Sequence, residues 1–125
     1  MNSISINNWD EVTLKEYEDK KLSHAKVQQT YDGLLQGSSE VNYQMAYTSE
    51  STASYVGTEL FEGSINGKSG SLVFLQRGTY AQGRVQSKFE VAPNSGTGEL
   101  TGISGHGEFA SSEAQSVEYS FEYKL

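Results

Sequence analysis

The part of this sequence best suited to chemistry places one carboxylate among aromatic residues. In the predicted strand over residues 53–65, the alternate positions from 55 to 61 are Tyr55, Gly57, Glu59 and Phe61. Successive side chains of a strand point to opposite faces, so these four residues share a face. A carboxyl group among aromatic rings is desolvated, which raises its pKa and suits it to act as an acid, a base or a ligand anchor. Glu59 is therefore the candidate catalytic residue; the alternative is a structural carboxylate paired with an internal Arg, Tyr or Gln.

The next strand offers two possible partners for Glu59. In residues 69–80 the alternating set that contains Leu72 and Gln76 is more apolar than the set that contains Arg77. We therefore expect Gln76 inside and Arg77 on the surface; with the opposite facing, Arg77 would pair with Glu59 or with a carboxylate ligand. The candidate ligand-binding residues are Glu59, Gln76, Tyr43, Tyr47, Tyr55 and Phe61. For the tyrosines the alternative is ordinary core or rim packing.

Period-two alternation recurs along most of the chain and predicts about eight strands that pair as antiparallel neighbours. Asn66-Gly67 is typical of a two-residue hairpin, and the glycine-rich residues 95–109 indicate a tight turn followed by a return strand. Each strand has one apolar and one polar face, and the terminal strands lack protected edges, which favours a closed barrel over a sandwich. Residues 10–21 are highly charged and are interpreted as a loop with one helical turn at most. Trp9 is expected to cap one end of the barrel.

Composition limits the range of possible functions. The 125 residues suit a single domain over 1–125, with 8 Tyr, 13 Gly and no Cys. A net charge of −7 and scattered basic residues argue against nucleic-acid binding. No signal peptide or membrane span is apparent, so a cytoplasmic location is expected. His24 and His106 lie far apart in the sequence, and neither a metal nor another cofactor is expected.

Three segments resemble a bacterial family known as domain of unknown function 3224. They are GTELFEGSINGKSGSLVFLQRGTY (57–80), VNYQMAYTSESTASYVG (41–57) and APNSGTGELTGISGHGEF (92–109). The resemblance implies an eight-stranded antiparallel barrel of the allene oxide cyclase-like type, within the wider calycin or lipocalin-like class, and it implies no activity. Family members often carry a histidine near the end of one strand, where this chain has Gln76 and Arg77.

The leading functional hypothesis is a barrel whose lumen binds a small, partly apolar molecule, because the inward faces are aromatic and Glu59 and Gln76 can anchor polar groups. Whether the chain is an enzyme stays open: one alternative is an isomerase or cyclase that acts in an apolar cavity. Another is a packed barrel that acts through its surface. Association into a homo-oligomer is a further possibility, implied by the family resemblance.

Overall fold

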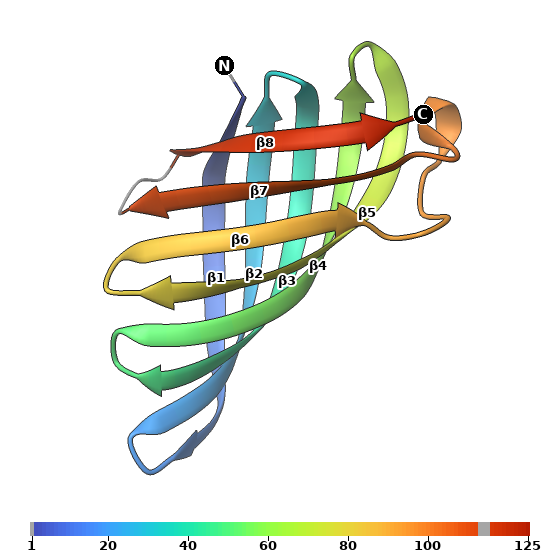
Figure 1. Ribbon diagram of the computed structural model, residues 1–125. Coiled ribbons are helices and arrows are strands. Elements are labelled where there is room, and N and C mark those ends of the chain that lie inside the picture. The colour runs from blue at the N-terminus through green and yellow to red at the C-terminus, as the bar shows by residue number, and fades with distance from the viewer. Residues whose placement is uncertain (1, 113–115) are drawn as a thin grey trace.

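Eight strands and one short 3-10 turn make up the protein in the computed structural model, which describes residues 2–112 and 116–125 (Figure 1). The elements are β1 (Ser3–Tyr17), β2 (Lys20–Asp32), β3 (Leu35–Ser49), β4 (Thr52–Ile65), β5 (Lys68–Ala81), β6 (Arg84–Val91), η1 (Gly98–Leu100), β7 (Ser104–Ser112) and β8 (Ser116–Lys124). Within the described residues no helix is long and apolar enough to cross a membrane.

The strands form one antiparallel sheet in sequence order, and the sheet closes on itself because β1 pairs with β8. The predicted all-β barrel is therefore confirmed. The closing contact is short and joins Ser3, Ile4 and Ser5 to Glu118, Val117 and Ser116. By contrast, β1 to β5 pair with their neighbours over most of their length.

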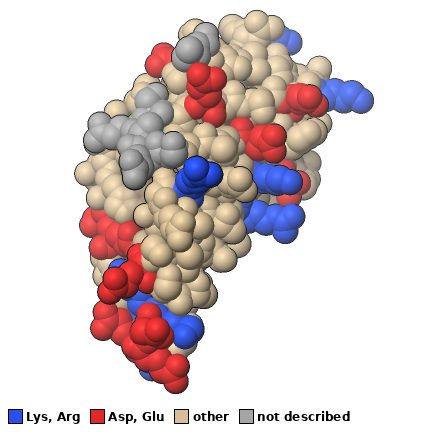
Figure 2. All heavy atoms as spheres, turned by 60° about the vertical axis from the view of Figure 1, so that its left-hand side comes forward, with Lys and Arg blue, Asp and Glu red and all other residues tan. Residues whose placement is uncertain are grey.

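The prediction of a loop over residues 10–21 is wrong. Strand β1 continues to Tyr17 and β2 begins at Lys20, so this segment is a β-hairpin that extends beyond the closed part of the barrel. Its side chains are mostly exposed on both faces, which removes the alternation of apolar and polar residues by which a half-buried strand is recognised. Charged residues gather at this end of the molecule, the lower end in Figure 2.

Two irregularities in the β1–β2 pairing decide which side chains of β1 point inward. The register shifts between Ile6 and Asn8 and again between Thr13 and Lys15. An extra residue in one strand reverses the facing of those that follow. After the first bulge, Trp9 and Glu11 therefore face the same side as Ile4 and Ile6. They pair with Val27 and Ala25 of β2, which are buried and face the same side.

The interior consists of two apolar clusters. The first is packed with Phe side chains and is covered by the η1 segment, whose Leu100 is fully buried; its largest members are Tyr31, Phe61, Phe74, Phe89 and Phe121. The second lies toward the β1–β2 and β3–β4 hairpins and contains Val27, Val41, Tyr43, Met45 and Tyr55. The buried polar residues Gln29, Ser39, Glu59, Gln76 and Ser87 complete the interior.

Glycines opposite aromatic residues shape the barrel wall. Tyr43 pairs with Gly57 and Tyr55 pairs with Gly78 on the neighbouring strands. A Cβ atom at Gly57 would lie 2.9 Å from Cδ1 of Tyr43, and one at Gly78 would lie 2.5 Å from the hydroxyl oxygen of Tyr55. The rings therefore lie over backbone that carries no side chain, an arrangement that helps to fix register between strands.

The packed cluster predicts a difference between two leucines on neighbouring strands. Leu72 is fully buried, whereas Leu60 on the outer face of β4 is 45% exposed. Leu72→Ala is expected to lower the free energy of unfolding by about 2–5 kcal/mol because it leaves a cavity. Leu60→Ala, the control, is expected to cost less than about 1 kcal/mol. Urea denaturation measures both, and equal losses would contradict the assignment of the two faces.

Candidate ligand-binding site

A cavity of about 360 Å³ lies at the end of the barrel that contains the second apolar cluster. Its wall draws residues from most of the strands and is strongly aromatic. The aromatic lining residues are Trp9, Tyr43, Tyr47, Tyr55, Tyr80 and Phe109. The volume and the apolar lining are typical of small-molecule sites. Among the described residues, none of those that line the cavity carries a formal charge.

Beneath this cavity, Glu59 is fully buried and accepts hydrogen bonds from three strands. The hydroxyls of Tyr31 on β2 and Ser39 on β3 each lie 2.6 Å from its Oε2 atom. The side-chain amide of Gln76 on β5 donates to Oε1. Within the described residues, no Lys, Arg or His forms an ion pair with Glu59. Neutral donors therefore satisfy the carboxylate.

Gln76 connects the buried carboxylate to the cavity. While its amide nitrogen donates to Glu59, its Oε1 atom accepts from the Tyr43 hydroxyl at 3.0 Å and from Ser87 at 3.2 Å. These contacts fix the orientation of the amide. Because the Tyr43 ring lines the cavity, a bound ligand would be separated from the carboxylate by only two side chains.

Burial dominates the protonation behaviour of this network. It raises the pKa of Glu59, and the hydrogen bonds from Ser39, Tyr31 and Gln76 offset that effect only in part. Burial, together with the nearby Glu59, also raises the pKa values of Tyr31 and Tyr43 well above 10. Both tyrosines are therefore neutral hydrogen-bond donors at neutral pH.

A second carboxylate, Glu11, lies at the rim of the cavity. Its Oε1 atom accepts from Nε1 of Trp9 at 3.0 Å, and its Oε2 atom accepts from Ser23 at 2.6 Å and from Tyr47 at 2.9 Å. Partial burial acts to raise the pKa of Glu11, but the hydrogen bonds and the nearby Lys21 lower it overall. Glu11 is therefore held in its ionised form against two residues that line the cavity.

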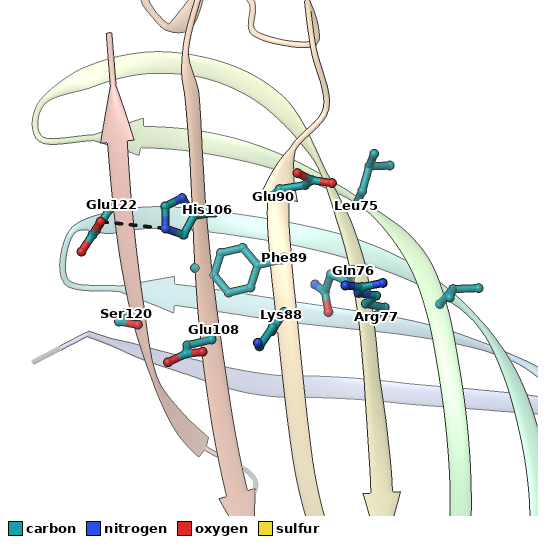
Figure 3. A pocket seen from close by; sticks show the side chains of 12 residues that line it. Leu75, Gln76, Arg77, Lys88, Phe89, Glu90, His106, Glu108, Ser120 and Glu122 are labelled. Carbon is teal, nitrogen blue, oxygen red and sulfur yellow. Dashed lines mark ion pairs between the residues drawn. The ribbon is translucent and has the colours of Figure 1, made fainter.

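Two larger depressions, of about 620 and 930 Å³, lie on the outer wall and are more open to solvent. Figure 3 shows the first of them, with charged side chains of both signs along β5 to β8. Arg77, Lys88 and Glu108 form one cross-strand row there, and His106 lies 3.9 Å from Glu122. Mixed, exposed charge of this kind is typical of a solvated surface, so the aromatic cavity at the barrel mouth is the better candidate.

The predicted site residues separate into three groups. Tyr43, Tyr47 and Tyr55 line the cavity, and their role as ligand contacts stays a prediction. Glu59 and Gln76 lie directly beneath it, and the prediction that Gln76 faces inward while Arg77 is exposed is confirmed.

Phe61 belongs to the packed cluster and does not line the cavity. Trp9, which was expected to cap one end of the barrel, lies at that end but is 44% exposed and forms part of the rim of the cavity.

The comparisons with known proteins agree with this architecture. The family model described as "Protein of unknown function (DUF3224)" matches residues 2–123. The chain belongs to this family. A crystal structure of a DUF3224 protein of unknown function from Shewanella oneidensis MR-1 is similar to this DUF3224 chain, with a TM-score of 0.75 and 25% sequence identity. The match covers 100% of this chain and 97% of the other. None of the curated proteins matches the chain.

Sequence reasoning did not identify Glu11, Gln29 or Ser39 as parts of this DUF3224 site. A signal existed for Gln29, which occupies an inward position between Val27 and Tyr31 in the alternating pattern of β2. The signal for Glu11 was absent, because its inward direction depends on a bulge that alternation alone does not reveal.

The buried carboxyl predicts a pH dependence of stability. Because the pKa of Glu59 in the folded protein lies above the ordinary value of 4.5, the folded protein retains a proton that the unfolded chain has released. The contribution of Glu59 to stability is thus fully present below pH 4.5 and is lost as the pH rises through the folded pKa.

Glu59→Gln is expected to remove this contribution. The difference in unfolding free energy between the wild type and Glu59→Gln should therefore become less favourable to the wild type as the pH rises above 4.5. Denaturant titrations at several pH values measure it, and Glu62→Gln, which removes an exposed carboxyl from the same strand, is the control. A difference that stays constant or changes in the opposite direction would contradict the raised pKa.

Proposed function

We propose that the protein binds a small, largely apolar molecule in the aromatic cavity at the mouth of the barrel. The observation that carries this proposal is the contrast between the two halves of the interior. One half is filled by close-packed aromatic side chains, while the other keeps a cavity of about 360 Å³ between aromatic walls. Protein interiors are normally close-packed, so an apolar space of this size at a barrel mouth suits a ligand.

Binding is favoured over catalysis by the position of the acidic groups. A general acid or base must lie within hydrogen-bond reach of the group that it protonates or deprotonates. Both oxygens of Glu59 are occupied by neighbouring side chains, and Glu59 does not line the cavity. In this proposal Glu59 is a positioning residue that holds Gln76 and, through it, Tyr43. An isomerase or cyclase activity, and the likeness to allene oxide cyclases, stay predictions.

Association of copies through the outer wall also stays a prediction. The exposed Val56, Leu60 and Leu75 lie on the outer face of β4 and β5 and are the residues at which it would be examined.

Two matched substitutions test the proposed site. Val85 lines the cavity on β6, and Val56 lies on the outer wall beside both depressions. Val85→Trp is expected to fill the cavity and to weaken binding of the neutral fluorescent probe N-phenyl-1-naphthylamine at least about tenfold, whereas Val56→Trp should leave it unchanged. Fluorescence titration gives both affinities, and thermal unfolding shows that both variants fold. Loss of binding in Val56→Trp alone, or no probe binding to the wild type, would contradict the proposal.

A further inference from the structure

The electrostatics of the cavity narrow the class of ligand, an inference that rests on the binding function proposed above. The cavity lies between two carboxylates, Glu11 at the rim and Glu59 beneath the floor. Neither forms an ion pair with a Lys, Arg or His among the described residues. The space between them has an apolar aromatic wall, and burial strengthens electrostatic interactions there because water screens them less.

The charge at the rim lies against residues that line the cavity. Trp9 and Tyr47 both donate hydrogen bonds to Glu11, and both line the cavity. Together with Ser23 they supply three neutral donors. A carboxylate has about four lone-pair sites, so one remains for a further donor.

The floor of the cavity is polar as well. Tyr31, Ser39 and Gln76 each form a hydrogen bond with the Glu59 carboxyl group. Gln76 and Tyr43 connect Glu59 to the cavity wall. Because the Tyr43 hydroxyl donates its hydrogen to Oε1 of Gln76, its oxygen keeps free lone pairs that can accept a hydrogen bond.

The aromatic walls favour the same sign of ligand charge. The ring centroids of Trp9 and Tyr43 lie 6.1 Å apart, and those of Tyr43 and Tyr55 lie 4.9 Å apart. The faces of such rings attract cations. The chain already shows this interaction at the rim, where Nζ of Lys21 lies 4.6 Å from the centroid of the Tyr47 ring.

We propose that the ligand is an organic monocation, a protonated amine or a quaternary ammonium group attached to an apolar body. The apolar body occupies the aromatic cavity, and the cationic group lies at the rim beside Glu11 and Tyr47. A ligand with a carboxylate, such as a fatty acid, meets repulsion from Glu11. The net charge of −7 adds to this preference by attracting cations at long range.

Three probes of one shape test the preferred charge. They are 4-phenylbutylamine, 4-phenylbutan-1-ol and 4-phenylbutyrate, which are cationic, neutral and anionic at neutral pH. Isothermal titration calorimetry is expected to give the amine an affinity about tenfold above that of the alcohol, with the carboxylate weakest.

Two variants locate the effect. Glu11→Gln is expected to reduce the affinity for the amine to about that for the alcohol measured on the same variant. Glu62→Gln, which removes the same charge from the exposed outer face, should leave the amine preference intact. Lys21→Met removes the internal cation over Tyr47 and should tighten binding of the amine.

The outcomes separate this inference from the proposed function. Preference for the amine that depends on Glu11 supports both. Equal affinity for the amine and the alcohol, or tightest binding of the carboxylate, supports a binding cavity and overturns the cationic ligand. Failure of all three probes to bind the wild type overturns the binding function and this inference with it. Because the comparison of probes uses the wild type, the test holds even if Glu11→Gln does not fold.

Discussion

A carboxylate buried without a cation must be satisfied by hydrogen bonds, and in this barrel Glu59 receives them from β2, β3 and β5. This requirement constrains four adjacent strands at once, including β4, which carries Glu59. A shift of one residue in any of the three donor strands would turn its donor to the outside and leave the carboxylate short of a partner. The polar layer formed by Glu59 and its three donors therefore fixes the register of these strands. A lost hydrogen bond costs more free energy here than at the surface, because the surroundings are apolar.

The same layer marks the boundary between a filled and a hollow half of the barrel. On one side, large Phe side chains pack edge to face across the lumen, and the η1 segment covers them. On the other side, Tyr43 and Tyr55 pair with Gly57 and Gly78, and their rings pack against the backbone at these glycines. The side-chain volume that glycine omits is what allows the two rings to approach the backbone of the neighbouring strand this closely.

The sequence was sufficient for the features that alternate with period two. It predicted the closed all-β barrel, the inward Glu59 and the inward Gln76, because each of these depends on local pattern and on the apolar balance between two faces. It did not predict which inward residues touch the cavity: Tyr43 and Phe61 have equivalent patterns but belong to different halves. That distinction depends on where each residue lies along the barrel axis. Phe61 lies in the half that the η1 segment covers, and Tyr43 lies in the other half.

The β1 hairpin shows why the chemistry of the mouth was the hardest part to predict. Two bulges and exposure on both faces remove the alternating signal, and the charged sequence then resembles a loop. Yet the first bulge is what turns Trp9 and Glu11 toward the lumen, where they meet Tyr43 and Tyr47 from β3. A regular strand would have placed the indole and the carboxylate on the outer wall and left the cavity without its rim charge. The ligand preference inferred here thus depends on one extra residue in the backbone of β1.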